Sequence, residues 1–233
     1  MKTGKNIVIF AMCIGFLFFG GVTQIFAAEF QNGDFESGFA GWSGDLVTTG
    51  TVNPNSDSSH FNLVHTSDPN LVWVADVKND DTDWTATLFQ DFTLDTLNGP
   101  GWTMDITFWL AWTPTDSTKD SISAQIQDTG YNETFDLLQN VSNQALLSGT
   151  WVTVDITTFV QTWGGQEVEL SFTISDGDYD PTDPNYQSTP DSFSVDNISF
   201  NQHAPAPVPE PATILLLGSG LCGLALSRKK KIG

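Results

Sequence analysis

Residues 102–112 alternate between two kinds of side chain over eleven positions. The even positions carry large apolar residues, whereas Thr103, Asp105 and Thr107 occupy the first odd positions. A period of two is the signature of a β-strand whose two faces meet different environments. A strand with one apolar face must cover that face with a second layer of structure. This segment therefore predicts a sheet that packs against another layer.

The same pattern recurs along the chain. The two-residue period appears again in residues 122–126, 152–156 and 168–174, and three further runs are rich in β-branched and aromatic residues, at 71–77, 85–94 and 192–200. Glycine, proline and asparagine separate these runs, as expected for turns. Residues 133–147 allow a short helical turn, but no long amphipathic helix competes. We therefore predict an all-β fold, an antiparallel jelly-roll β-sandwich.

An apolar segment lies at each end of the chain. Residues 1–28 have two early lysines, an apolar stretch and small residues at the end, the pattern of a secretory signal peptide; a retained membrane anchor is the alternative. Residues 201–211 form a proline-rich spacer, and residues 212–233 combine an apolar, helix-compatible stretch with a basic end. The predicted order is signal peptide 1–28, β-sandwich 29–200, spacer 201–211, and transmembrane helix with basic tail 212–233.

The region between the two ends is strongly acidic. Residues 29–208 contain 27 acidic residues but only two basic ones, Lys78 and Lys119, which gives a formal charge of −25. Nucleic-acid binding is excluded because it requires a basic surface. Both cysteines, Cys13 and Cys222, lie in the apolar end segments, so the body has no thiol for a disulfide. The strongly acidic surface favours solubility and association with calcium.

The C-terminus contains three features in a fixed order. A Val-Pro-Glu-Pro sequence precedes the apolar stretch, and four basic residues follow it: Val208, Pro209, Glu210, Pro211, and then Arg228, Lys229, Lys230 and Lys231. This arrangement resembles the PEP-CTERM sorting tail, which an exosortase recognises in Gram-negative bacteria that often make exopolysaccharide. The resemblance implies export, a transient inner-membrane intermediate, and delivery to the cell surface or extracellular matrix. An ordinary tail anchor is the alternative that the residues leave open.

Two sequences at opposite ends of the body carry a second resemblance. FQNGDFESG at residues 30–38 and VDNISF at residues 195–200 resemble the first and last strands of galactose-binding-like jelly-roll domains, which include many carbohydrate-binding modules. The resemblance implies that these strands meet and share a structural calcium ion, held by Glu36 and Asp196. Asn32 and Asp34 are further candidate ligands because residues two apart share a strand face. The alternative is a group of solvated acids near a strand end.

The sequence contains no recognisable catalytic set. Its three histidines are not spaced as a zinc-binding helix motif, and no nucleophile elbow is present. Carboxylate pairs for glycoside hydrolysis are uninformative among so many acids. We therefore predict a non-enzymatic, exported protein that binds extracellular polysaccharide. A structural matrix protein assembled through calcium, without a sugar pocket, and a glycan-active enzyme are the alternatives.

The tryptophans suggest where sugar would bind. Four of them have polar neighbours or lie opposite the buried phase: Trp84, Trp109, Trp151 and Trp163. Exposed aromatic side chains provide apolar faces for sugar rings, so these four are candidate ligand-binding residues. Packing against the second sheet, or covering an edge, is the alternative for each. Trp42, Trp102 and Trp112 are predicted to pack in the core.

Overall fold

A computed structural model describes residues 29–80, 82–177 and 190–206. The predicted signal peptide, the sorting motif and the predicted transmembrane helix with its basic tail lie outside these residues. Within the described part of the chain, no helix has the length and apolar character needed to cross a membrane.

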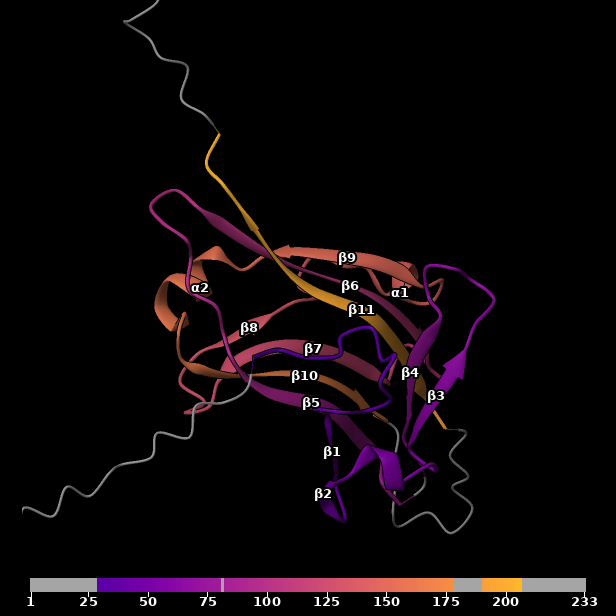
Figure 1. The fold of residues 1–233 in the computed structure, drawn as a ribbon. Coiled ribbons are helices and arrows are strands. Elements are labelled where there is room, and N and C mark those ends of the chain that lie inside the picture. Colours follow the sequence, from indigo (N-terminus) through magenta and orange to yellow (C-terminus); the bar gives the residue numbers. More distant parts are fainter. Residues whose placement is uncertain (1–28, 81, 178–189, 207–233) are drawn as a thin grey trace, which may run out of the picture.

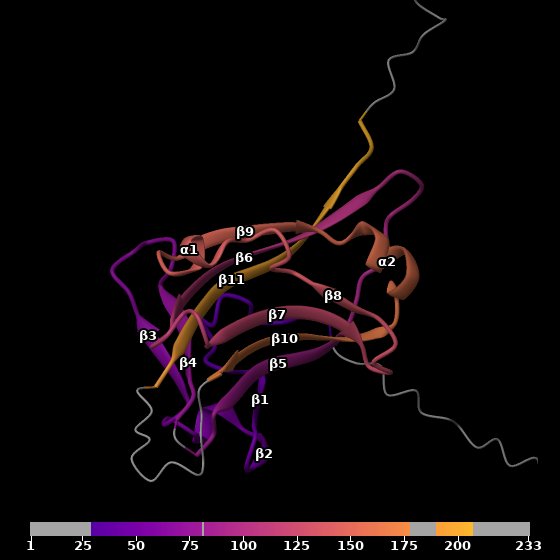
Figure 2. The same cartoon turned by 180° about the vertical axis from the view of Figure 1, so that it is seen from behind.

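Two antiparallel sheets lie face to face (Figures 1 and 2). The six-stranded sheet has the order β2-β1-β5-β10-β7-β8, and the five-stranded sheet has the order β3-β4-β11-β6-β9. From β4 to β7, and again from β9 to β11, successive strands alternate between the sheets, as in a jelly roll. The predicted all-β antiparallel sandwich is confirmed.

The element bounds are as follows. The six-stranded sheet contains β1 (Ser43–Leu46), β2 (Gly50–Val52), β5 (Thr85–Thr93), β7 (Ser121–Asp128), β8 (Thr134–Asp136) and β10 (Glu167–Ser175). The five-stranded sheet contains β3 (Phe61–His65), β4 (Trp73–Lys78), β6 (Thr103–Thr113), β9 (Thr150–Asp155) and β11 (Ser192–His203). The helical elements are η1 (Pro54–Ser56), α1 (Asn143–Leu146) and α2 (Thr157–Trp163).

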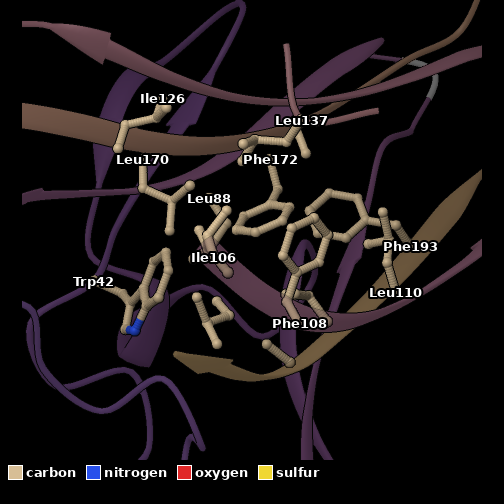
Figure 3. Close-up of a cluster of buried hydrophobic side chains, with 14 of the residues drawn as sticks. Trp42, Leu88, Ile106, Phe108, Leu110, Ile126, Leu137, Leu170, Phe172 and Phe193 are labelled. Atoms are coloured by element: carbon tan, nitrogen blue, oxygen red, sulfur yellow. The ribbon is translucent and has the colours of Figure 1, made fainter. Parts of the chain in front are cut away.

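The core lies between the sheets and contains the apolar phase of each long strand (Figure 3). The even positions of β6 are at most 1% exposed, as predicted from the alternation. Phe108 of β6 meets Phe172 of β10 edge-to-face, with ring centroids 5.3 Å apart. Trp42 and Trp112 are buried as predicted, whereas Trp102 precedes β6 and is only partly buried. Burial of these large side chains supplies the main stabilisation of the sandwich.

The segment expected to form the first strand is a series of turns instead. Asn32 and Phe35 have positive φ angles of 54° and 53°, which a strand does not accommodate. The segment nevertheless meets the last strand, because the Ile198 amide donates to the Gly33 carbonyl at 2.9 Å. Phe35 is fully buried and anchors the turns in the core. The expected strand is therefore wrong, and the shared strand face assumed for residues 32–36 does not exist.

Candidate functional site

The outer face of the six-stranded sheet is hollowed into a groove of about 620 Å³. Alternate residues of β5 point into the core, so the intervening positions Thr87, Phe89 and Asp91 line the groove. Strands β1, β2, β7 and β10 add further side chains, and Tyr131, which is 71% exposed, stands at its edge. The groove thus combines two aromatic rings with a predominantly polar floor.

Hydrogen bonds between neighbouring strands order the floor of the groove. The Gln127 side-chain amide donates to Glu169 Oε1 at 2.7 Å, which joins β7 to β10. The hydroxyl groups of Thr87 and Thr173 lie 2.9 Å apart and join β5 to β10. These contacts hold the polar groups in place before any ligand binds, which reduces the entropic cost of binding.

Two carboxyl groups in the groove have perturbed acidity. Asp91 and Glu169 are directly opposite each other in the β5–β10 register. Burial raises the pKa of Glu169, and the negative charges of Asp91 and Asp45 raise it further. Hydrogen bonds from Gln127 and Ser171 lower the pKa, but by less. Burial and the charge of Glu167 raise the pKa of Asp91. Both groups therefore keep their protons to a higher pH than ordinary carboxyl groups do, and protonated carboxyl groups can donate hydrogen bonds.

The four predicted tryptophans do not form one surface. Trp109 of β6 and Trp151 of β9 are register partners on the outer face of the five-stranded sheet, and Trp151 is 52% exposed. Gly149 approaches the Trp109 ring so closely that an added Cβ would lie 2.6 Å from Trp109 Cζ2. Trp151 also borders an open hollow of about 470 Å³ together with residues 32–34 and 197–199.

The other two predicted tryptophans lie elsewhere. Trp163 ends α2, and its indole donates to Glu133 Oε2 at 2.8 Å. Trp84 directly precedes β5, where its carbonyl accepts from the Asp176 amide. Both are partly buried. The structure therefore pairs only Trp109 with Trp151 among the four candidates.

Three of the predicted calcium ligands, Asp34, Glu36 and Asp196, lie close enough for their charges to interact. Asp196 is 1% exposed and lies where the register of β11 against β6 shifts. Its pKa is raised to about 7, chiefly by burial and also by the negative charges of Asp34 and Glu36. A hydrogen bond from the Asn197 amide acts in the opposite direction and lowers the pKa. Oxygen atoms of three carboxylates suit a hard cation such as calcium. Asp34, Glu36 and Asp196 do not, however, form one of the groups of described residues whose ligand atoms all lie within 4.8 Å of one another, so a shared calcium ion would require their carboxylates to move closer together.

Asn32, the fourth predicted ligand, stabilises the turn. Its side-chain amide donates to the Gly38 carbonyl at 2.7 Å and to the Ala40 carbonyl at 3.2 Å. Its side-chain oxygen accepts from the Ser37 amide at 3.0 Å. The polar atoms of Asn32 thus hold the conformation that presents Asp34 and Glu36.

Comparison with protein families identifies the C-terminal tail. The sequence model of the PEP-CTERM protein-sorting motif matches residues 207–229. This match confirms the predicted sorting tail and indicates an exported, exosortase-sorted protein. No curated protein matches the chain.

Several solved structures resemble the body of the chain. The xylan-binding domain CBM22-2 of Paenibacillus barcinonensis Xyn10C has a TM-score of 0.41 at 14% identity, covering 73% of this chain and 97% of that one. A carbohydrate-binding module specific for non-crystalline cellulose, CBM28, has a TM-score of 0.38 at 16% identity, with coverages of 76% and 97%. The enzymatically active domain of bacteriophage CBA120 tailspike protein 4 has a TM-score of 0.44 at 13% identity; the match covers 76% of this chain but 22% of the tailspike chain.

Proposed function

We propose that this exported protein binds a neutral extracellular polysaccharide in the groove on the six-stranded sheet, without catalysing a reaction. The composition of the groove supports the proposal. Phe89 and Tyr131 offer aromatic faces, and Gln125 and Gln127 offer amide groups beside them. Sugar rings bind proteins through both kinds of contact, since their carbon faces are apolar and their hydroxyl groups are polar.

The charge of the groove supports a neutral ligand. Four carboxyl groups line it, and none of the described lining residues is lysine or arginine: the acids are Asp45, Asp91, Glu167 and Glu169. An anionic polymer would be repelled by the negative charge of these groups. The hydroxyl groups of a neutral sugar can instead donate hydrogen bonds to carboxylates, and such bonds are stronger than neutral ones.

The sorting tail suggests where this binding takes place. We propose that an exosortase in the inner membrane of a Gram-negative bacterium recognises residues 208–211 and releases the protein to the cell surface or the extracellular matrix. The ligand would then be the exopolysaccharide of the same cells. A calcium ion held by Asp34, Glu36 and Asp196 would fasten the N-terminal turns to β11.

Replacing Phe89 by alanine is expected to weaken polysaccharide binding at least tenfold, about 1.4 kcal/mol, because the groove loses a stacking surface. Affinity electrophoresis in gels that contain xylan, hydroxyethyl cellulose or the native exopolysaccharide measures the loss. Trp151→Ala is the matched control, since it removes an exposed aromatic ring from the opposite sheet. If Trp151→Ala weakens binding and Phe89→Ala does not, the binding surface is the Trp109–Trp151 pair.

A glycan-active enzyme is the second candidate, and the Asp91–Glu169 pair favours it. Side chains directly opposite each other on neighbouring strands have Cβ atoms roughly 4.5–5.5 Å apart, and glycosidases use two carboxyl groups at comparable separations. We expect no release of reducing ends when the protein is incubated with the polysaccharides above. Release that Glu169→Gln abolishes would establish the enzyme instead.

A further inference from the structure

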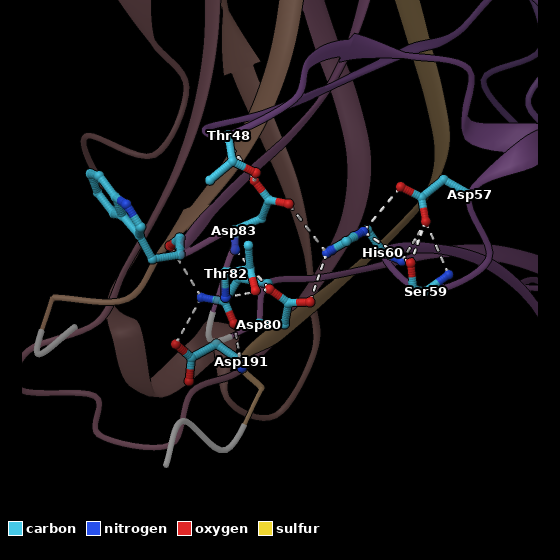
Figure 4. Close-up of polar contacts among 10 residues, drawn as sticks. Thr48, Asp57, Ser59, His60, Asp80, Thr82, Asp83 and Asp191 are labelled. Carbon is cyan, nitrogen blue, oxygen red and sulfur yellow. Dashed lines mark hydrogen bonds and ion pairs between the residues drawn. The ribbon is translucent and has the colours of Figure 1, made fainter. Parts of the chain in front are cut away.

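A buried histidine, His60, faces the carboxylates of Asp57, Asp80 and Asp83 (Figure 4). His60 is 7% exposed and directly precedes β3. Its Nδ1 atom lies 3.0 Å from Asp57 Oδ2. Its Nε2 atom lies 3.2 Å from Asp80 Oδ2 and 3.9 Å from Asp83 Oδ2. Nε2 is buried, yet it makes no directed hydrogen bond with any described residue.

The two aspartates beyond Nε2 are fixed by hydrogen bonds to their other oxygen atoms. Asp80 Oδ1 accepts from the Thr82 and Asp83 amides, both at 2.7 Å. Asp83 Oδ1 accepts from the amide of Thr48 at 2.8 Å and from its hydroxyl group. In each carboxylate, the remaining oxygen atom, Oδ2, faces His60. Burial would raise the pKa of Asp80, but the hydrogen bonds from the Asp83 and Thr82 amides lower it below its ordinary value.

Asp57 orients the imidazole from the other side. Its Oδ1 atom accepts hydrogen bonds from Ser59, which leaves Oδ2 for His60 Nδ1. Burial opposes ionisation of Asp57, but hydrogen bonds from Ser59 and His60 lower its pKa overall. An ionised carboxylate at this position accepts a hydrogen bond from a protonated Nδ1, so we assign the tautomer with the lone pair on Nε2. A carboxylate behind a histidine is the usual support for a metal-binding imidazole.

We propose that His60 Nε2, Asp80 Oδ2 and Asp83 Oδ2 bind a divalent transition-metal ion of the zinc class. Each of the three residues offers one ligand atom within 4.8 Å of those of the other two. In a tetrahedral site with bonds of about 2.1 Å, ligand atoms are about 3.4 Å apart, and the observed 3.2 and 3.9 Å lie on either side of this value. Imidazole favours zinc, cobalt or nickel over calcium, which prefers oxygen ligands alone.

The ion would join two separate connections of the sandwich. His60 belongs to the loop before β3, whereas Asp80 and Asp83 belong to the connection between β4 and β5. A metal ion between them would bind the folded chain and not the unfolded one, and would thereby stabilise a body that contains no cysteine. The metal-free alternative is a doubly protonated His60 that forms ion pairs with Asp57 and Asp80.

Cobalt titration of the metal-stripped full chain, purified in detergent, separates these two states. Excess calcium is included to saturate clusters of carboxylates alone, such as Asp120, Asp176 and Asp191. We expect one Co²⁺ per chain to give visible d–d absorption, and stoichiometric Zn²⁺ to abolish it. His60→Gln is expected to lose this signal, whereas His203→Gln should keep it, because His203 contacts Asp105 at an exposed site away from the cluster.

The half-exposed Asp80 provides a second variant in case His60→Gln does not fold. Asp80→Asn keeps the shape of the side chain and should weaken Co²⁺ binding at least tenfold. Absence of d–d absorption in the wild-type chain would overturn the proposal in favour of the protonated histidine. Equal cobalt binding by the wild-type chain and either folded variant would also overturn it.

Discussion

Chelation of calcium at pH 7.5 is expected to lower the melting temperature of the wild-type chain by about 5–10 °C. A ligand whose free concentration is about 100 times its dissociation constant adds about 2.7 kcal/mol to the free energy of unfolding. For a protein of this length, each kcal/mol raises the melting temperature by about 2–4 °C. Without the ion, Asp34, Glu36 and the buried Asp196 repel one another, and the pKa of Asp196 rises to about 7. Differential scanning calorimetry in calcium and in chelator measures the shift.

The raised pKa of Asp196 also determines how the free energy of unfolding changes with pH when calcium is removed by a chelator. Between the ordinary pKa of 3.8 and the folded value of about 7, the folded chain retains a proton on Asp196 that the unfolded chain has released. The free energy of unfolding must therefore fall as the pH rises through this window, by about 1.4 kcal/mol for each unit of pKa difference in the limit of full coupling. Calcium displaces the proton and should remove this dependence.

For Asp196→Asn, whether the variant or the wild type has the higher melting temperature is expected to depend on whether calcium is present. In chelator the variant should melt at or above the wild-type temperature, because it removes one of three mutually repelling charges. In calcium it should melt below the wild type, since a ligand is lost. Asp95→Asn, at an exposed acid outside the cluster, is the control and should follow the wild type in both conditions. A wild-type melting temperature that is unaffected by chelator would rule out the calcium site.

Replacing Gly33 by alanine is expected to destabilise the fold by about 3 kcal/mol, since overpacking typically costs 1–3 kcal/mol and the obstacle here is backbone. An added Cβ would lie 2.1 Å from the Ile198 carbonyl oxygen and 2.9 Å from a Phe30 ring carbon. The hydrogen bond from the Ile198 amide to Gly33 would have to break or shift. Because this contact positions the turns that carry Asp34 and Glu36, calcium affinity should fall as well. Urea unfolding with and without calcium measures both effects.

Gly50→Ala is the matched control for the steric part of this effect. Gly50 has a φ of +70°, but an added Cβ would meet no atom within 4 Å. Its replacement should cost only about 1 kcal/mol, the usual penalty for a left-handed conformation. If the two variants lose the same free energy of unfolding, the close approach of Gly33 to β11 adds little to the cost of Gly33→Ala.

The long strands could be predicted from the sequence because each repeats its alternation several times. Strands β5, β6, β7, β10 and β11 each have at least eight residues, and all fall within or across the predicted runs. The short strands β1, β2, β3 and β8 have three to five residues, too few to establish a period. Helix α2 was not predicted, because its Thr-Thr-Phe-Val sequence favours a strand and its N-cap residue, Ile156, makes no side-chain cap. Burial of Phe159 and Val160 stabilises this helix instead.

The candidate sites also differ in how far the sequence could predict them. The resemblance placed Asp34 and Glu36 near Asp196, although it assumed a strand where the structure has turns. The groove could not be predicted, because the Asp91–Glu169 pair depends on the register between β5 and β10. The polar phase of residues 85–94 was a visible signal for an outward face, but not for its partners. The cluster around His60 likewise joins residues from separate loops and has no spacing motif.

Calorimetric titration of the full chain in calcium tests polysaccharide binding most directly. The ligands are the native exopolysaccharide, xylan and hydroxyethyl cellulose, with alginate as the anionic comparison. We expect saturable binding to at least one neutral polymer, weak or absent binding to alginate, and loss of the signal in Phe89→Ala. A folded chain that binds none of the neutral polymers and self-associates on addition of calcium would contradict the proposal and indicate a matrix protein without a sugar site.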